Sequence, residues 1–193
     1  ITNLIYFQTM IDPQTRKKLI ALVRKQVVPA IGCTEPICVA LACARATEKL
    51  QALTGRTGLV PSRIDVRLSA NILKNAMGVG IPGTGMVGLP IAIALGALIG
   101  KSEYGLEVLR DCSPEAVERG RKFIDEGRID IRLATAEDFE RSSVTPDEKL
   151  FVDICAHDDE GHCGCATIAH EHTHFTACGQ EANTSIQAPT DIA

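Results

Sequence analysis

One stretch of the sequence, residues 76–100, contains no charged residue at any of its 25 positions. A run of this length is sufficient for a membrane span, because a spanning helix needs about 20 apolar residues. Its first half, however, is interrupted by five glycines and by Pro82 and Pro90. Only residues 89–99 remain as a continuous helix former. We therefore expect a glycine-rich loop followed by a short buried helix, and no membrane span.

The segments around this run carry helical and extended patterns. Apolar residues at helical spacing predict a helix from Asp12 to about Val28, and a second, alanine-rich helix from Thr34 to about Leu53 that is buried on more than one side. Ser113, Pro114 and Glu115 form the start signal of a third helix, which ends near Gly127. Alternating apolar residues predict strands at 63–69, 129–133, 150–154 and 163–178, the last interrupted by a turn or bulge within 170–173. The sequence thus predicts an α+β fold in which helices and a glycine-rich loop pack with a small, mostly antiparallel sheet.

The charge balance and the cysteine content exclude several classes of protein. With 24 acidic and 20 basic residues and a net charge of -4, the chain lacks the basic surface that nucleic acids require. Its eight cysteines lie among alanine, valine and isoleucine, and they are too few for a disulfide scaffold, in which cysteine exceeds roughly 8%. No secretory leader begins the sequence. We expect a cytoplasmic protein with free thiols.

The two ends differ in character from the rest. Residues 3–8, Asn-Leu-Ile-Tyr-Phe-Gln, are close to a protease site used in expression vectors, so residues 1–9 are interpreted as a tag remnant. Residues 179–193 are polar and unpatterned, which predicts a tail or a linker stub. The folded portion is therefore expected within residues 10–178.

Cys33 is a candidate functional residue because it lies at the predicted start of the second helix. Helix N-termini lower the pKa of a thiol through the helix dipole and the free backbone N–H groups, which favours the reactive thiolate. Cys38 and Cys43 follow at intervals of five residues, and five residues turn a helix through about 140°. The three sulfurs therefore point in different directions, and we interpret Cys38 and Cys43 as core residues.

The glycine-rich loop matches the pattern Gly-x-Gly-x-x-Gly twice, at 78–83 and at 83–88. A dinucleotide site needs a strand before this pattern and a helix after it, and neither copy has both. A flexible backbone that precedes a helix still offers N–H groups to an anion such as a substrate carboxylate. Lys74 and Asn75, just before the loop, add a cation and an amide.

The last part of the sequence is rich in histidine and cysteine. Two interpretations remain open: a metal site built on paired strands, or the solvent face of an antiparallel sheet that happens to carry histidines. Neighbours two apart, such as Cys163 and Cys165 or His172 and His174, share one face of a strand. The residues concerned are Cys155, His157, His162, Cys163, Cys165, His170, His172, His174 and Cys178.

Three segments together resemble a known enzyme family. Residues 30–42 contain Gly-Cys-Thr-Glu-Pro, residues 74–83 begin Lys-Asn-Ala-Met, and residues 85–92 read Gly-Met-Val-Gly-Leu-Pro-Ile-Ala. In this order they resemble the L-cysteine desulfidase family, which is related to the iron–sulfur L-serine dehydratase alpha chain. The resemblance extends over about residues 15–175.

The resemblance implies a cytosolic lyase that eliminates sulfide or water from L-cysteine or L-serine to give pyruvate and ammonia. It implies a [4Fe–4S] cluster held by three cysteines, with Cys33 as one ligand. From their spacing and motifs, the candidates for substrate contact are Thr34, Glu35, Lys74, Asn75, Gly83 and Gly85. Family members are about twice this length, and their other two cluster cysteines lie beyond the matched part. Residues 10–178 are therefore expected to be an N-terminal portion that needs its missing C-terminal half, and to be inactive alone.

Two other functional classes compete with the lyase. The histidine- and cysteine-rich strands favour a metal-binding or regulatory module, and an apolar surface that the missing half normally covers favours an interaction domain that self-associates. Expected partners are a small amino-acid substrate, the C-terminal half and, as one option, a second copy of the chain. The identity of the general base and the choice between cysteine and serine remain open.

Overall fold

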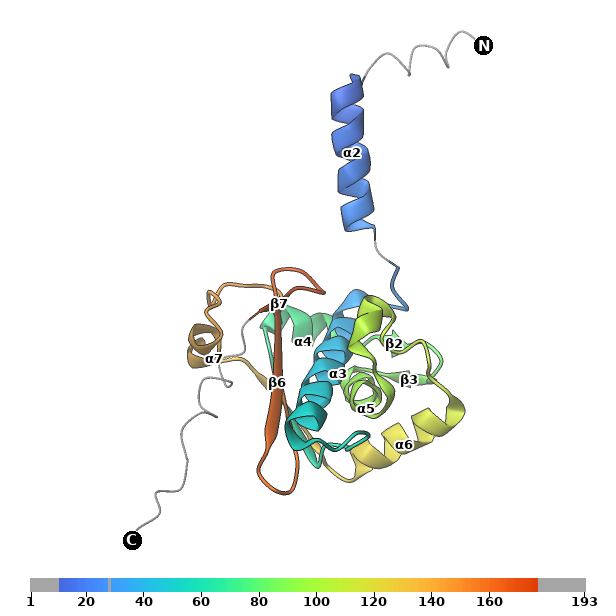
Figure 1. Cartoon of the computed structure of the whole chain (residues 1–193), viewed down its shortest axis with the longest axis vertical. Coiled ribbons are helices and arrows are strands. Elements are labelled where there is room, and N and C mark those ends of the chain that lie inside the picture. Colours follow the sequence, from blue (N-terminus) through green and yellow to red (C-terminus); the bar gives the residue numbers. More distant parts are fainter. Residues whose placement is uncertain (1–10, 28, 177–193) are drawn as a thin grey trace.

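The computed structural model describes residues 11–27 and 29–176. The predicted α+β fold is confirmed (Figure 1). The helices are α2 (Pro13–Gln26), α3 (Thr34–Thr54), α4 (Ala70–Ala76), α5 (Leu89–Ile99), the 3-10 helix η1 (Ser102–Glu107), α6 (Pro114–Asp125) and α7 (Ala136–Arg141). The strands are β1 (Arg63–Leu68), β2 (Gly80–Ile81), β3 (Met86–Val87), β4 (Ile129–Leu133), β5 (Phe151–His157), β6 (Cys163–Ala169) and β7 (Phe175–Thr176).

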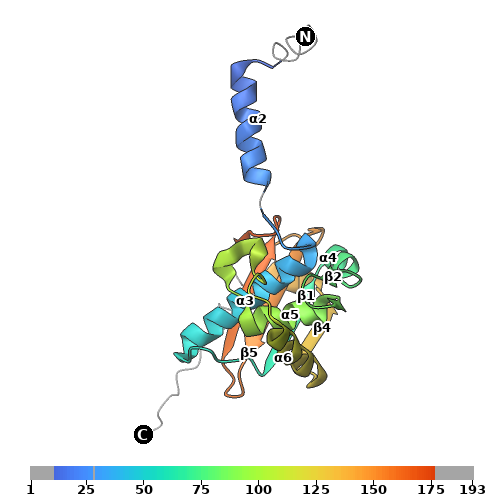
Figure 2. The same ribbon diagram turned by 90° about the vertical axis from the view of Figure 1, so that its right-hand side faces the viewer.

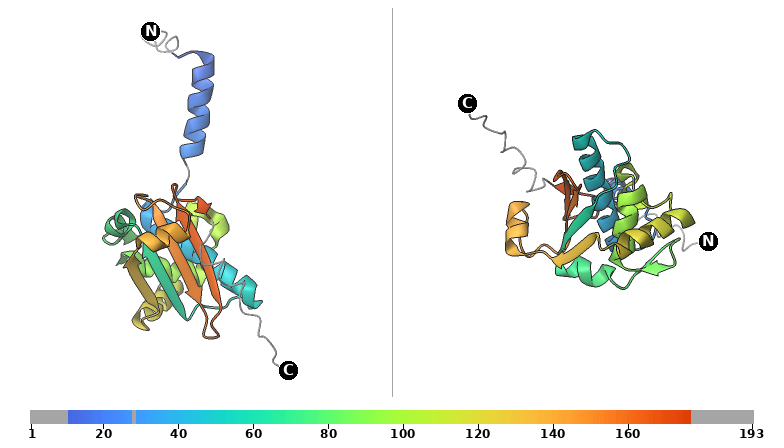
Figure 3. Two further views of the ribbon diagram at one scale, coloured as in Figure 1. Left: turned by 90° about the vertical axis from the view of Figure 1, so that its left-hand side faces the viewer. Right: turned by 90° about the horizontal axis from the view of Figure 1, so that it is seen from below.

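Five strands form one sheet in the order β4-β1-β5-β6-β7, and β2 and β3 form a separate small hairpin. Only the pair β1–β4 is parallel, so the prediction of a mostly antiparallel sheet is confirmed. Ile154 pairs with Ala166, and both lie on the face that packs against the helices. The alternate residues form the second, more polar face of the sheet, which carries Arg67, Asp153 and Thr167. α7 lies in front of this face (Figure 3, left), with its Phe139 packed on Phe151.

α3 is the central helix of the apolar layer. It packs on β5 and β6 and against α5, while α6 covers α5 on the far side (Figures 1 and 2). Gly96 of α5 brings the two helices together, since a Cβ there would lie 2.5 Å from the carbonyl oxygen of Ala40. Gly164 of β6 likewise allows α3 to lie close to the sheet, since a Cβ at Gly164 would lie 2.3 Å from the carbonyl oxygen of Ala46. The expected burial of α3 on more than one side is confirmed.

α2 stands apart from the layers (Figures 1 and 2). Its N-cap is Asp12, as predicted, with the carboxylate accepting from the backbone N–H of Gln14 at 2.9 Å and of Thr15 at 3.0 Å. The apolar stripe that predicted the helix is exposed, with Leu22 54% and Val23 56% accessible.

Some expectations lie outside the described residues, and some elements were not predicted. The proposed tag remnant, the tail and Cys178 all fall outside the described ranges. None of the helices within those ranges combines the length and the apolarity that a membrane span requires. The elements that the sequence patterns did not predict are α4, α7, η1 and the β2–β3 hairpin.

Candidate functional site

The start of α3 brings a thiol and a carboxylate into contact. Cys33 is the N-cap residue, with extended backbone angles and no capping bond from its side chain. Its Sγ instead donates a hydrogen bond to Oε2 of Glu35 at 2.9 Å, and the hydroxyl of Thr34 donates to the same oxygen at 3.2 Å. All three residues are half-buried. The first turn of α3 is therefore a partly shielded polar group that solvent still reaches.

α4 adds an amide to this group. Ser69 caps α4 through a bond from the backbone N–H of Ile72 to its hydroxyl, at 3.4 Å. At the other end of the helix, Nδ2 of Asn75 donates to Oε1 of Glu35 at 3.4 Å. Both oxygens of the carboxylate thus have donors from α3 or α4. The neighbouring Lys74 lies in the last turn of α4 with its side chain exposed.

The glycine-rich loop is the third component. It forms the β2–β3 hairpin, in which Gly83 and Gly85 have φ angles of 79° and 64° that only glycine adopts easily. Thr84 closes the turn by donating to the carbonyl of Ile81 at 2.7 Å and accepting from the N–H of Met86 at 2.9 Å. Gly83 and Gly85 themselves are exposed and remain accessible to a ligand.

Contact between Gly32 and Pro82 ties this loop to the start of α3. A Cβ on Gly32 would lie 2.9 Å from Cγ and Cδ of Pro82, and the φ of Gly32 is +92°. The loop therefore lies directly against the residue that precedes Cys33. Of the candidate residues from the sequence, the structure brings together Cys33, Thr34, Glu35 and Asn75 by direct contact. The loop that carries Gly83 and Gly85 joins them through Pro82.

The expectation that the helix start favours a Cys33 thiolate is wrong. The hydrogen bond to the Glu35 carboxylate, together with partial burial, raises the pKa of Cys33 above its ordinary value. The backbone N–H groups of Thr34 and Glu35 do lower this pKa, as the sequence argument assumed, but the nearby negative charge outweighs them. Cys33 is therefore described as a thiol that donates a hydrogen bond to the Glu35 carboxylate.

A residue from the other end of the chain also acts on Glu35. The bond from Cys33 lowers the pKa of Glu35 more than burial raises it, and the charge of His172 lowers it further. His172 lies in the turn between β6 and β7, where it is half-buried. The sequence patterns gave no signal for this proximity, because His172 and Glu35 are far apart in the chain and share no motif.

Replacing Glu35 by glutamine tests this description of Cys33. Glu35→Gln removes the negative charge but keeps the backbone donors, so the pKa of Cys33 should fall. Its alkylation by iodoacetamide at pH 7.5 should then become at least about threefold faster. Peptide mass spectrometry resolves Cys33 from the other cysteines. Glu118→Gln, at an exposed position of α6, is the matched control. An unchanged Cys33 rate in Glu35→Gln would contradict the conclusion that Glu35 raises the pKa of Cys33.

The histidine- and cysteine-rich segment does not form a single cluster, since His157 contacts Asp65 and His170 contacts Glu148. Cys155, Cys163 and Cys165 come together on β5 and β6. His162 bonds through Nδ1 to Asp158 at 2.9 Å in the β5–β6 turn. The prediction that His172 and His174 share a strand face is wrong, because both precede β7 in the turn that follows β6. A turn within 170–173 was expected, and it is confirmed.

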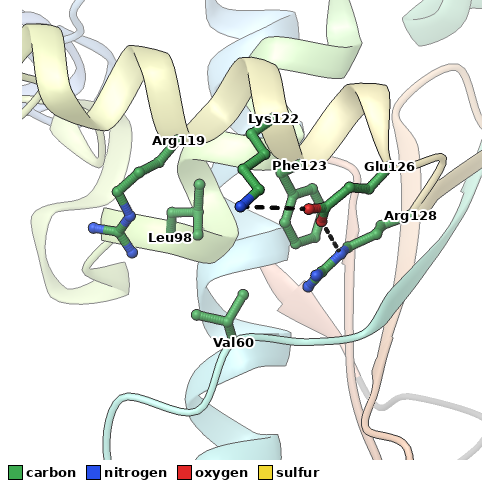
Figure 4. A pocket seen from close by; sticks show the side chains of 7 residues that line it. All are labelled: Val60, Leu98, Arg119, Lys122, Phe123, Glu126 and Arg128. Atoms are coloured by element: carbon green, nitrogen blue, oxygen red, sulfur yellow. Dashed lines mark ion pairs between the residues drawn. The ribbon is translucent and has the colours of Figure 1, made fainter.

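A pocket of about 300 Å³ lies elsewhere, between α6 and the segment before β1 (Figure 4). Arg119, Lys122 and Arg128 line it together with one carboxylate, Glu126, which pairs with Arg128 at 2.7 Å and with Lys122 at 3.9 Å. It contains none of the residues singled out by the sequence. We therefore place the candidate site at the start of α3.

The chain is similar to several proteins that carry the name UPF0597. It is 56% identical over 160 residues to UPF0597 protein BF3560 of Bacteroides fragilis, an alignment that covers 83% of this chain and 33% of that protein. It is 57% identical over 166 residues to the UPF0597 protein of Phocaeicola vulgatus, covering 86% of this chain and 35% of that protein. The UPF0597 protein of Oleidesulfovibrio alaskensis is 41% identical over 180 residues, an alignment that covers 93% of this chain and 38% of that protein.

The chain thus spans about a third of the length of the curated relatives it matches. No family model matches it. No solved structure matches it either.

Proposed function

We propose that this chain forms part of an iron–sulfur amino-acid lyase, to which it contributes one cluster ligand and part of the substrate site. The reaction is the elimination of sulfide or water from L-cysteine or L-serine. The observation that supports the proposal most directly is the contact between Cys33 and Glu35 at 2.9 Å, with Asn75 on the same carboxylate. These residues come from two of the three segments on which the family resemblance rests.

The donor set at this site suits one ligand position of a cluster. Cys38 and Cys43 are unsuitable as further ligands because both are fully buried, and burial raises the pKa of Cys43 to about 12. Cys43 also donates to the carbonyl of Ile93 at 3.3 Å. The groups of three or more potential ligands found among the described residues do not include Cys33. The other cluster ligands are therefore assigned to parts of the protein outside residues 11–27 and 29–176.

A bound cluster would supply an open iron that withdraws electron density from the leaving group. The residues of this chain would hold the cluster and orient the substrate. Glu35 orients the thiol of Cys33 through the hydrogen bond that it accepts, and the thiol proton leaves to solvent when the sulfur becomes a thiolate ligand. Asn75 donates to the other oxygen of the carboxylate. Lys74 and the exposed backbone N–H groups of the loop at Gly83 and Gly85 provide a complementary surface for the substrate carboxylate.

The elimination itself is a proton transfer coupled to loss of the β-substituent. A base removes the α-proton, the C–S bond of cysteine or the C–O bond of serine breaks, and sulfide or water leaves. The aminoacrylate that results takes up water and gives pyruvate and ammonia. No residue of this chain is assigned as the base.

The test uses the full-length natural gene product that contains this sequence, reconstituted with iron and sulfide under anaerobic conditions. The wild-type protein should show iron–sulfur absorbance and should form pyruvate from L-cysteine or L-serine. Cys33→Ser should lose both, with activity reduced at least about 100-fold because the cluster lacks a ligand. Cys112→Ser, a half-buried cysteine outside the site, is the control. Full absorbance and full activity in Cys33→Ser would refute the assignment.

A further inference from the structure

Three thiols gather on the polar face of the sheet, away from the site at the start of α3. The β5–β6 register places Cys155 directly opposite Cys165, and Cys163 lies two residues before Cys165 on the same face. The Sγ atoms of Cys163 and Cys165 are 3.1 Å apart, and the three Sγ atoms all lie within 4.8 Å of one another. Cys155 and Cys165 are buried and Cys163 is half-buried.

This spacing matches the coordination sphere of one metal ion. Thiolates bound to zinc at about 2.3 Å in a tetrahedral arrangement lie about 3.8 Å apart, which is within the range seen here. A cubane cluster holds its thiolates farther apart, because each thiolate binds a different iron. We propose that Cys155, Cys163 and Cys165 form a three-thiolate site for a single thiophilic ion of the zinc or copper(I) type. The half-buried Cys163 provides the approach from solvent.

The charge around the thiols supports ligation. Three thiolates and a divalent ion carry a net charge of -1, and Nη1 of Arg67 lies 3.6 Å from Sγ of Cys155. Arg67 is buried, and it is held in place by Asp153 at 2.8 Å and by Asp138 at 3.7 Å. The guanidinium also balances these carboxylates, so it offsets part of the excess negative charge of the loaded site.

The thiol site and the Cys33 site are separated by the sheet. Gly164, between Cys163 and Cys165, faces α3 at Ala46, so its two neighbours point to the opposite face. Cys33 precedes Ala46 by 13 residues of helix, which is about 20 Å along the axis. These thiols are therefore not the missing ligands of a cluster at Cys33. The bound ion instead joins β5 to β6.

Zinc titration of the purified, reduced, chelator-treated protein tests the site. Competition against a chromophoric chelator should reveal one equivalent of tightly bound Zn²⁺, and Co²⁺ in its place should give thiolate-to-cobalt charge-transfer absorbance. Cys163→Ser and Cys165→Ser should each weaken Zn²⁺ binding at least about 100-fold. Cys163 is half-buried, so its serine variant is expected to stay folded, which circular dichroism checks.

Cys112→Ser is the matched control and should bind zinc as the wild type does. Three results would overturn the proposal: no stoichiometric zinc in the wild type, unchanged affinity in folded Cys163→Ser and Cys165→Ser, or cobalt absorbance without a thiolate band. The second result would instead place the ion at another group, such as Asp158, Glu160 and His162 in the β5–β6 turn. Loss of zinc together with retention of iron–sulfur activity would leave the proposed lyase function untouched.

Discussion

Gly164→Ala should lower the free energy of unfolding by at least about 3 kcal/mol, the upper part of the range for overpacking. The added methyl group would lie 2.3 Å from the carbonyl oxygen of Ala46 and 2.4 Å from the backbone nitrogen of Leu50. Both atoms belong to the α3 backbone, so no side-chain rotation relieves the clash. The helix must move off β6, and the apolar contacts between them are then lost along their length.

Urea denaturation of the wild type and the variant measures this loss, and a thermal midpoint lower by at least about 6 °C should accompany it. Gly78→Ala is the matched control, because a Cβ at Gly78 would have no neighbour within 4 Å. Its stability should stay within about 0.5 kcal/mol of the wild type. A Gly164→Ala protein as stable as this control would show that α3 and β6 are not packed as closely as described.

Asp138→Asn should cost about 3 kcal/mol of unfolding free energy, the lower end of the range for breaking a buried ion pair. Asp138 is 2% exposed, and its oxygens accept two bonds from Arg132, at 2.6 and 3.0 Å, and one from Arg141. Thr135 adds its backbone N–H at 2.7 Å. Arg132 and Arg141 are partly exposed, so water solvates their charges when the carboxylate is removed. We therefore expect a cost in unfolding free energy at the lower end of the range.

The pH dependence of this loss follows from the pKa of Asp138. Burial raises that pKa, but the hydrogen bonds from Arg132 and Thr135 outweigh burial and hold it well below its usual range. A carboxyl group whose pKa is depressed on folding stabilises the fold above its unfolded pKa of about 3.9, and this contribution disappears as the pH falls toward the folded value. The difference between wild type and Asp138→Asn should thus be constant from pH 7 to pH 5 and should narrow below about pH 4.

Denaturation series at fixed pH values measure this trend. Asp125→Asn, an exposed carboxylate on α6, is the control and should change stability little at any pH. A gap between wild type and Asp138→Asn that stays constant down to pH 2 would contradict the ionic origin of the effect.

Local signals in the sequence were sufficient for most of the fold. Apolar residues at helical spacing located α3, the capping residue Ser113 located α6, and alternation of apolar residues located β1, β4, β5 and β6. The short helix α7 was missed although it has a start signal: Thr135 and Asp138 form a capping box. The six residues of α7 are too few for a helical period to be visible in the sequence.

The site was less accessible to sequence reasoning, because its contacts join distant segments. The sequence predicts the position of Cys33 at a helix start. It does not predict the raised pKa of Cys33, because that depends on the side chain of Glu35 lying against the thiol. Alternation also predicted that Cys163 and Cys165 share a face. It did not predict Cys155 as their neighbour, because a face pattern does not specify which strands pair or in which register.

The place of β1 in the sheet has a consequence for how the chain acquires its fold during synthesis. β1 lies between β4 and β5, and both partners are made more than 60 residues after it. Until residues 129–133 and 151–157 leave the ribosome, both edges of β1 lack their hydrogen-bonding partners and the sheet-facing surface of α3 has nothing to cover. Such non-local pairing is slow, because the entropy of closing a long loop is lost before the contacts between the strands stabilise the chain. Among the described residues, β5 and β6 are the last long strands along the chain, and the core of the described part can close only after they have been made.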